Sequence, residues 1–116
     1  MDKIFDLKKI ILSTLDSNKA LDIVSIDLEN KSLMADYLII ASGTSSRHMQ
    51  ALSEIVLEKF KSNGISNCKI EGNKSNDWKL IDGIDVVVHI FNPEKRKFYD
   101  LEKMWSELIP KEKILI

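Results

Sequence analysis

The sequence is short of the features that mark secreted, membrane or nucleic-acid-binding proteins. Cys68 is its only cysteine, which excludes an intrachain disulfide and a cysteine-rich zinc site and fits a reducing setting. No apolar run approaches the roughly 18 residues that a membrane-spanning helix needs. Met1 leads directly into an amphipathic segment that contains acids, unlike a signal or transit peptide. These absences predict a soluble, cytoplasmic protein.

The chain also has no strong excess of positive or negative charge, since its formal net charge is only −1 at pH 7. A nucleic-acid-binding domain is usually clearly basic, and the cations at residues 95–97 (KRK) stand without interleaved aromatic residues. We therefore expect direct nucleic-acid contact to be minor. With 44% apolar and 30% charged residues, the 116-residue chain has the composition of a globular protein. We expect a single domain over residues 1–110 and a C-terminal tail at residues 111–116.

The spacing of apolar residues predicts an α/β domain, a mixed β-sheet with packed helices. The segment between two of the strands is helical, which permits a parallel pair, while a late hairpin must be antiparallel. We expect helices from Asp2 to about residue 15, from a cap at Thr44 or Ser45 to Gly64, and over residues 99–108, and strands at residues 21–26, 36–41, about 69–71 and, as a hairpin turning near Asp82 and Gly83, within 78–91.

That hairpin, WKLIDGIDVVVHIF, places acids and a histidine among apolar residues. A metal site is one explanation to consider. Asp85 and His89 are four residues apart, which is roughly 13 Å along a strand, so they cannot share one ion. His48 has no acidic neighbour at ligand spacing. We therefore predict no metal and no cofactor.

Nucleotidyl transfer is the strongest enzymatic alternative. Residues 43–45 (GTS) follow a strand and begin a helix, where backbone N–H groups can bind a phosphate. The chemistry also needs paired carboxylates to hold a divalent metal, usually two residues apart on the next strand. Asp82 and Asp85 are three apart with Gly83 between them, which suits a turn better. We favour an ordinary capped connection and no enzyme, and we keep nucleotide binding as the alternative.

A protein-binding surface is the remaining explanation. In a strand, Trp78 and Leu80 share one face, whereas Lys79 and Ile81 share the other. On the next strand Asp85, His89 and Phe91 alternate with valines that suit a core. If Trp78 or Leu80 is exposed, the sheet presents an apolar patch with charge around it. Periodicity alone favours the core and the surface position of Trp78 about equally.

A series of short motifs runs along the chain: residues 35–37 (ADY), 41–43 (ASG), 78–82 (WKLID), 85–89 (DVVVH) and 98–102 (FYDLE), followed by Trp105. In this order the motifs resemble the ribosomal silencing factor family, also called the Iojap family. The likeness runs from about Leu7 to Trp105, nearly the whole chain. One position departs from many relatives, which have glycine where this chain has Ile84.

The resemblance implies a nucleotidyltransferase-like fold that has lost its catalytic acids. It also implies binding to the fourteenth protein of the large ribosomal subunit, at the intersubunit face, so that the small subunit cannot join and translation falls when nutrients are scarce. A role in late large-subunit maturation and a homodimer of the free protein are further expectations. The residues implied as contacts are Trp78, Leu80, Asp82, Asp85, His89 and Tyr99.

Overall fold

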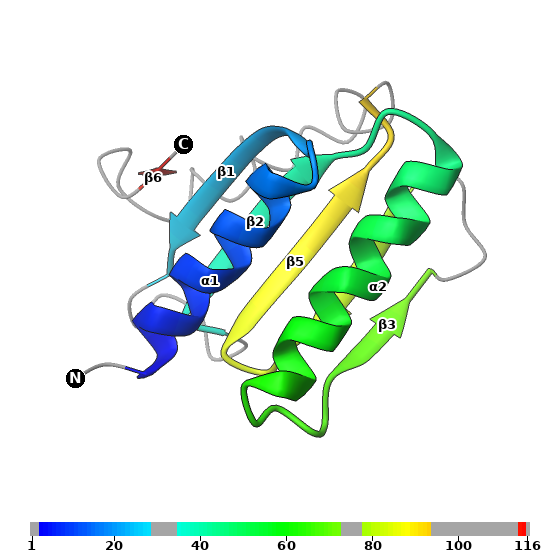
Figure 1. Ribbon diagram of the computed structural model, residues 1–116. Coiled ribbons are helices and arrows are strands. Elements are labelled where there is room, and N and C mark those ends of the chain that lie inside the picture. The colour runs from blue at the N-terminus through cyan, green and yellow to red at the C-terminus, as the bar shows by residue number, and fades with distance from the viewer. Residues whose placement is uncertain (1–2, 29–34, 73–77, 94–113, 116) are drawn as a thin grey trace.

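The computed structural model describes residues 3–28, 35–72, 78–93 and 114–115. Within them, two helices and six strands form one α/β unit with a single mixed sheet in the order β3-β4-β5-β2-β1-β6 (Figure 1). This confirms the predicted α/β class, a mixed β-sheet with packed helices. The elements in chain order are α1 (Lys3–Ser17), β1 (Leu21–Asp27), β2 (Tyr37–Ser42), α2 (Ser46–Ser62), β3 (Lys69–Glu71), β4 (Trp78–Asp82), β5 (Val86–Phe91) and β6 (Ile114–Leu115).

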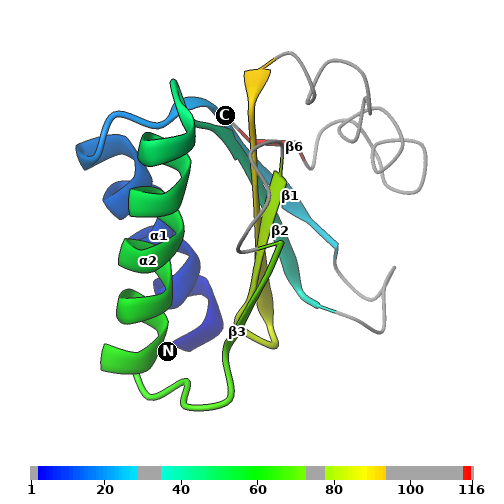
Figure 2. The same ribbon diagram turned by 90° about the vertical axis from the view of Figure 1, so that its right-hand side faces the viewer.

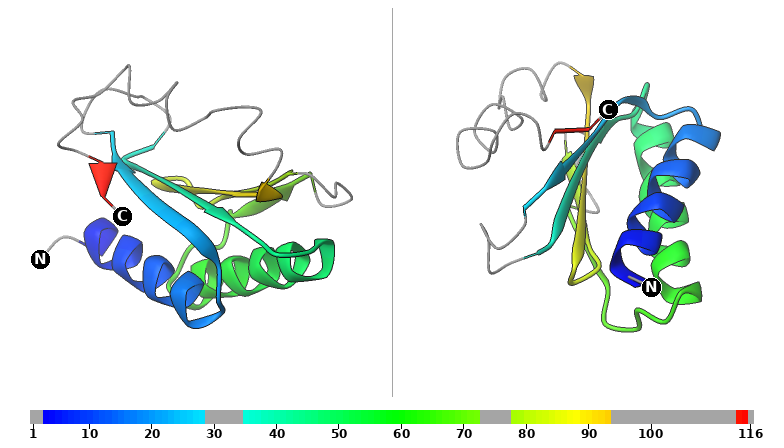
Figure 3. Two further views of the ribbon diagram at one scale, coloured as in Figure 1. Left: turned by 90° about the horizontal axis from the view of Figure 1, so that it is seen from above. Right: turned by 90° about the vertical axis from the view of Figure 1, so that its left-hand side faces the viewer.

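Both helices pack on the same side of the sheet (Figures 2 and 3). Helix α1 lies along β1 and β2, while α2 lies along β5, β4 and β3 (Figure 1). We call the face under the helices the inner face and the opposite one the outer face. Neither described helix is long and apolar enough to cross a membrane.

The helices form where apolar residues recur at three- and four-residue intervals, as predicted. In α1, Leu7, Ile11 and Leu15 are buried against the inner face. Helix α2 begins after Ser45, whose hydroxyl accepts a hydrogen bond from the backbone N–H of His48 at 3.0 Å, so Ser45 is its N-cap. Beyond its end Gly64 has φ of +90°, the left-handed conformation expected there.

The central strand is β2, and all six of its residues are buried. It pairs in parallel with β5, with Tyr37 opposite Val86 and Ser42 opposite Phe91. A parallel pair was predicted to be possible, but the sequence did not identify β5 as the partner. The predicted antiparallel hairpin of β4 and β5 is confirmed.

Near the C-terminus, β6 pairs with β1 in antiparallel fashion. The helix expected at residues 99–108 and the cap at Asp2 lie outside the described residues. The domain limits at residues 110 and 111 therefore stay a prediction.

The sheet separates two apolar clusters. The larger one joins the inner face to both helices, and it includes Phe60 and Ile81, both 0% exposed. The smaller one lies on the outer face and is built around Ile40 and Phe91, with Trp78 and Val87 partly buried at its border. Of the candidate contact residues that the structure describes, Trp78, Leu80, Asp82 and His89 lie on the β4–β5 side of this second cluster.

Candidate docking surface

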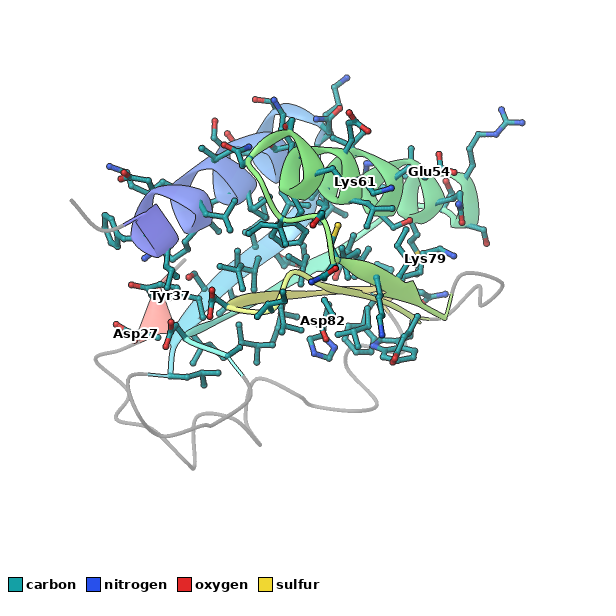
Figure 4. All side chains as sticks on the ribbon, turned by 90° about the horizontal axis from the view of Figure 1, so that it is seen from below. Asp27, Tyr37, Glu54, Lys61, Lys79 and Asp82 are labelled. Carbon is teal, nitrogen blue, oxygen red and sulfur yellow. The ribbon has the colours of Figure 1, made fainter. Side chains whose placement is uncertain are left out.

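Strand β4 presents its large aromatic residue on the outer face and a lysine on the inner face. Lys79 and Ile81 are buried, whereas Trp78, Leu80 and Asp82 are each partly exposed. Figure 4 shows Lys79 and Asp82 on opposite sides of the sheet, with Lys79 on the side of Glu54 and the helices. Trp78 and Leu80 therefore share a face, as predicted, and that face is the outer one.

The inner lysine is held under α2. Its Nζ donates a hydrogen bond to the carbonyl oxygen of Gly72 at 3.3 Å. Burial lowers the pKa of Lys79, and the nearby carboxylate of Glu54 partly opposes this effect. The contact ties β4 to the end of β3, so Lys79 serves the structure of the sheet.

On the outer face, three rings form a row across β4 and β5. The indole Nε1 of Trp78 donates to Nδ1 of His89 at 3.2 Å, and the two ring centroids are 6.2 Å apart. The His89 ring is nearly parallel to that of Phe91, with centroids 5.9 Å apart and an interplanar angle of 4°. The structure thus brings Trp78 and His89 into direct contact, and Leu80 lies opposite His89 in the strand ladder.

The environment of His89 favours its neutral form. Burial lowers the pKa of His89 from 6.5 to about 4. At neutral pH the imidazole therefore carries no charge, and its Nδ1 remains available to accept the indole hydrogen bond.

The two aspartates of the hairpin lie on either side of the turn between β4 and β5, Asp82 at the end of β4 and Asp85 just before β5. Asp82 ends β4 on the outer face, and its Oδ1 accepts a hydrogen bond from the backbone N–H of Ile84 at 2.8 Å. Asp85 was expected within the strand, but β5 begins one residue later, at Val86, because the backbone of residues 83–85 is used for the turn. The Asp85 carbonyl instead accepts N–H groups of Asp36 and Tyr37 at 2.9 and 3.1 Å.

Ile84 lies in the turn between β4 and β5. Its φ is +74°, in the left-handed region that favours glycine, and its side chain is 48% exposed. The turn therefore keeps the backbone of a glycine turn with a β-branched residue in it. Sequence reasoning placed the turn correctly but did not predict this conformation.

Two charged residues of β3 adjoin the surface and were not predicted as part of it. Lys69 lies opposite Asp82, and Glu71 lies opposite Leu80. Ile70 between them packs with the inner cluster, so strand alternation puts both charged side chains on the outer face. The signal was present in the alternation of residues 69–71, but β3 was too short for sequence to assign its neighbour.

Tyr99, the last of the expected contact residues, lies outside the described residues. The surface that can be described is therefore the group Trp78, Leu80, Asp82 and His89, which we call the outer patch. Asp85 adjoins it through the turn.

At the start of α2, two of the backbone N–H groups considered for a phosphate are used inside the protein. The Gly43 N–H is donated to the carbonyl of Phe91 at 3.0 Å, and the Thr44 N–H is donated to Nδ1 of His48 at 2.9 Å. His48 also contacts the carbonyl of Asn18 through Nε2 at 2.9 Å, so its role is to tie the start of α2 to the end of α1.

The acids considered for that site lie at the wrong end of the sheet. Gly43 follows the last residue of β2, whereas Asp85 is hydrogen-bonded to residues at the start of β2. A strand of this length separates the two ends by roughly 20 Å. Asp82 and Asp85 therefore cannot act with residues 43–45 on one phosphate. Among the described residues, no group of three or more histidine, cysteine, aspartate or glutamate side chains could hold a metal ion.

The fold defines a class of small α/β proteins in which two helices cover one face of a mixed sheet. A crystal structure of a protein from Chromobacterium violaceum shares it, with a TM-score of 0.84 and 34% identity, over 91% of this chain and 88% of that one.

Sequence comparisons give the family. The family model described as "Ribosomal silencing factor during starvation" matches residues 2–114. A ribosomal silencing factor of Zymomonas mobilis is 43% identical over 100 residues, which cover 86% of this chain and 75% of that protein. A mouse protein named "Mitochondrial assembly of ribosomal large subunit protein 1" is 34% identical over 105 residues, covering 88% of this chain and 46% of that protein. The chain belongs to the ribosomal silencing factor (Iojap) family, whose members regulate translation and are not enzymes.

Proposed function

We propose that this protein binds the large ribosomal subunit at its fourteenth protein, on the intersubunit face, and sterically blocks joining of the small subunit. Translation then falls when nutrients are limiting, and the same binding aids late maturation of the large subunit. The proposal places the protein in the cytoplasm with the ribosomes. Its main support is family membership together with the outer patch, where Trp78 and Leu80 are partly exposed beside Asp82.

The chemistry of the patch suits a basic protein partner. A partly exposed tryptophan can act as an anchor, because such residues often dominate the energy of an interface. Asp82, with Asp85 in the adjoining turn, would meet cationic side chains and favour fast, correctly oriented association. Steric blocking needs occupancy and no turnover, and a micromolar complex requires only about 8 kcal/mol of binding free energy.

We also propose that the domain has a nucleotidyltransferase-like fold that lacks the catalytic acids. It is supported by the separation of Asp82 and Asp85 from the start of α2 and by the internal use of the Gly43 and Thr44 N–H groups. A nucleoside triphosphate with magnesium should not raise the melting temperature, since only a ligand of the native state stabilises it. A clear rise would contradict this.

The decisive experiment adds the purified protein to isolated ribosomal subunits and measures whole-ribosome formation by sedimentation. The wild type should lower the fraction of joined ribosomes and co-sediment with large subunits. Trp78→Ala should weaken that binding by about thirtyfold or more while the domain stays folded by circular dichroism. Undiminished joining in the presence of wild-type protein would refute the proposal.

A matched control comes from the other side of the molecule. Lys61 is exposed near the end of α2, on the side of the helices (Figure 4). Lys61→Ala should block joining as well as the wild type does. Equal loss with Lys61→Ala and Trp78→Ala would contradict docking through the outer patch.

A further inference from the structure

The indole of Trp78 is held between two residues from neighbouring parts of the sheet. His89 on β5 accepts its N–H at 3.2 Å, and Gly72, directly after β3, lies against its six-membered ring. A Cβ atom on Gly72 would lie only 3.0 Å from Cε3 of Trp78 and 2.6 Å from its carbonyl oxygen. The ring therefore has a defined place before any partner binds.

The hydrogen bond also fixes the state of the imidazole. Because Nδ1 accepts the indole proton, the single proton of the neutral ring must be on Nε2. A doubly protonated imidazole would have no acceptor to offer, and the contact would be lost. The low pKa of His89 keeps the ring in the accepting state at physiological pH.

Gly72 supplies the other side of the clamp. Its φ is +73°, a conformation that other residues rarely adopt, and any side chain there would meet the indole. Its carbonyl accepts the Nζ donor of the buried Lys79, so the position of Gly72 is itself fixed from the inner face. Gly72, which contacts the indole on the outer face, is thus linked to Lys79 on the side under α2.

His89 is partly exposed, but its ring is engaged by two neighbours. Its ring is nearly parallel to Phe91, and Trp78 is hydrogen-bonded to its Nδ1. Holding a large side chain in its bound orientation lowers the cost of association, because less conformational freedom is lost on binding.

We propose that His89 and Gly72 are positioning residues that fix the Trp78 indole in the orientation used for docking, and that His89 does not itself contact the partner. This rests on the proposed function and deepens it, since it assigns different roles to two residues of the same patch. Trp78 contacts the large subunit, and His89 acts through Trp78.

Two substitutions of His89 separate positioning from contact. His89→Phe keeps an aromatic ring beside Phe91 but removes the acceptor, while His89→Asn loses the ring and keeps an acceptor near the position of Nδ1. The readouts are hydrogen exchange of the Trp78 indole N–H by NMR, assigned by its absence in Trp78→Ala, and binding to isolated large subunits. His89→Phe should speed exchange and weaken binding, each by about tenfold. His89→Asn should restore both to within about threefold of the wild type.

The outcomes distinguish the inference from the proposed function. If Trp78→Ala loses binding but His89→Phe binds as the wild type does, the positioning role is wrong and the docking site stands. If His89→Phe and His89→Asn both lose binding with indole exchange unchanged, His89 contacts the partner directly and the inference is overturned. If Trp78→Ala itself binds normally, the proposed docking site fails and the inference fails with it.

Discussion

The two faces of strand β4 reverse the usual pattern of a half-buried strand, in which apolar residues face the core and charged residues face the solvent. Its inner face buries a lysine beside an isoleucine, while its outer face leaves a tryptophan and a leucine partly exposed. Burying Lys79 costs desolvation, and leaving Trp78 partly exposed forgoes part of its apolar burial. A strand selected for stability alone would exchange these residues. The outer side of β4 is therefore the candidate for a function other than folding.

Truncating neighbouring residues of β4 tests this contrast most directly. Ile81 is 0% exposed in the inner cluster, so Ile81→Ala should lower the free energy of unfolding by about 3 to 4 kcal/mol. Leu80→Ala, on the outer face, should cost about 1 kcal/mol of stability because its side chain is only partly buried. Denaturant unfolding measures both.

Binding to large subunits should show the opposite order. Folded Ile81→Ala protein should bind as the wild type does, whereas Leu80→Ala should bind about tenfold more weakly. A Leu80→Ala variant that loses several kcal/mol of stability and binds normally would place Leu80 in the core and remove the contrast between the faces.

Acid should destabilise the protein through the outer face. The pKa of His89 is 6.5 when unfolded and about 4 when folded, so between these values the unfolded chain takes up a proton that the native state does not. Stability due to this group is therefore complete above about pH 6.5, falls as the pH decreases and levels off below about pH 4. The loss should reach about 3 kcal/mol at most.

The His89→Phe variant isolates this contribution, because every other titrating group is common to both proteins. When the free energy of unfolding of the wild type and of His89→Phe is plotted from pH 7 to pH 4, the two curves should converge or cross, because the wild type loses stability faster. Parallel curves would show that His89 is not desolvated on the outer face.

The smallest predicted effect lies in the turn that joins the two strands. Ile84→Gly relieves a φ of +74° and gives up a side chain that is 48% exposed. Relief of the strain should stabilise the folded state by about 1 to 2 kcal/mol. The extra conformational freedom of glycine in the unfolded chain offsets part of this stabilisation. The variant should be more stable by about 0.5 to 1 kcal/mol in thermal unfolding.

Ile84→Ala is the control, since alanine keeps the strain and loses the same exposed side chain beyond Cβ. If it stabilises the protein as much as Ile84→Gly does, the exposed side chain and not the backbone is the source of the effect. Unchanged binding by Ile84→Gly would confine the outer patch to the strands.

Local pattern carried most of the fold prediction. Apolar spacing predicted a helix between a cap at Thr44 or Ser45 and Gly64, and the apolar residues Met49, Leu52, Val56 and Phe60 of α2 are indeed buried. Alternation correctly grouped Trp78 with Leu80. The pairing of β2 with β5 was not predictable, because two strands and a helix intervene and local spacing carries no information about distant partners. Periodicity states which residues share a face, but which face the helices cover is decided by the whole topology.

The sequence predicted which residues belong to the candidate site better than it predicted what each residue does there. Trp78 and His89 were both predicted as contacts, but their hydrogen bond depends on the register between β4 and β5, which single residues do not encode. Gly72 was assigned no role from the sequence. Its importance comes from the ring that lies against it, and no sequence signal marks such an approach.

The pairing of β4 with β5 has a consequence for how the protein acquires its surface. These strands are joined by a short turn, so their ladder closes a small loop and can form early, whereas the β2–β5 ladder must close a long one. The row of three rings belongs entirely to the early pair. Most of the surface is thus specified by contacts between residues close in sequence, and substitutions in distant β1 or α1 should delay completion of the fold without changing the shape that the hairpin presents.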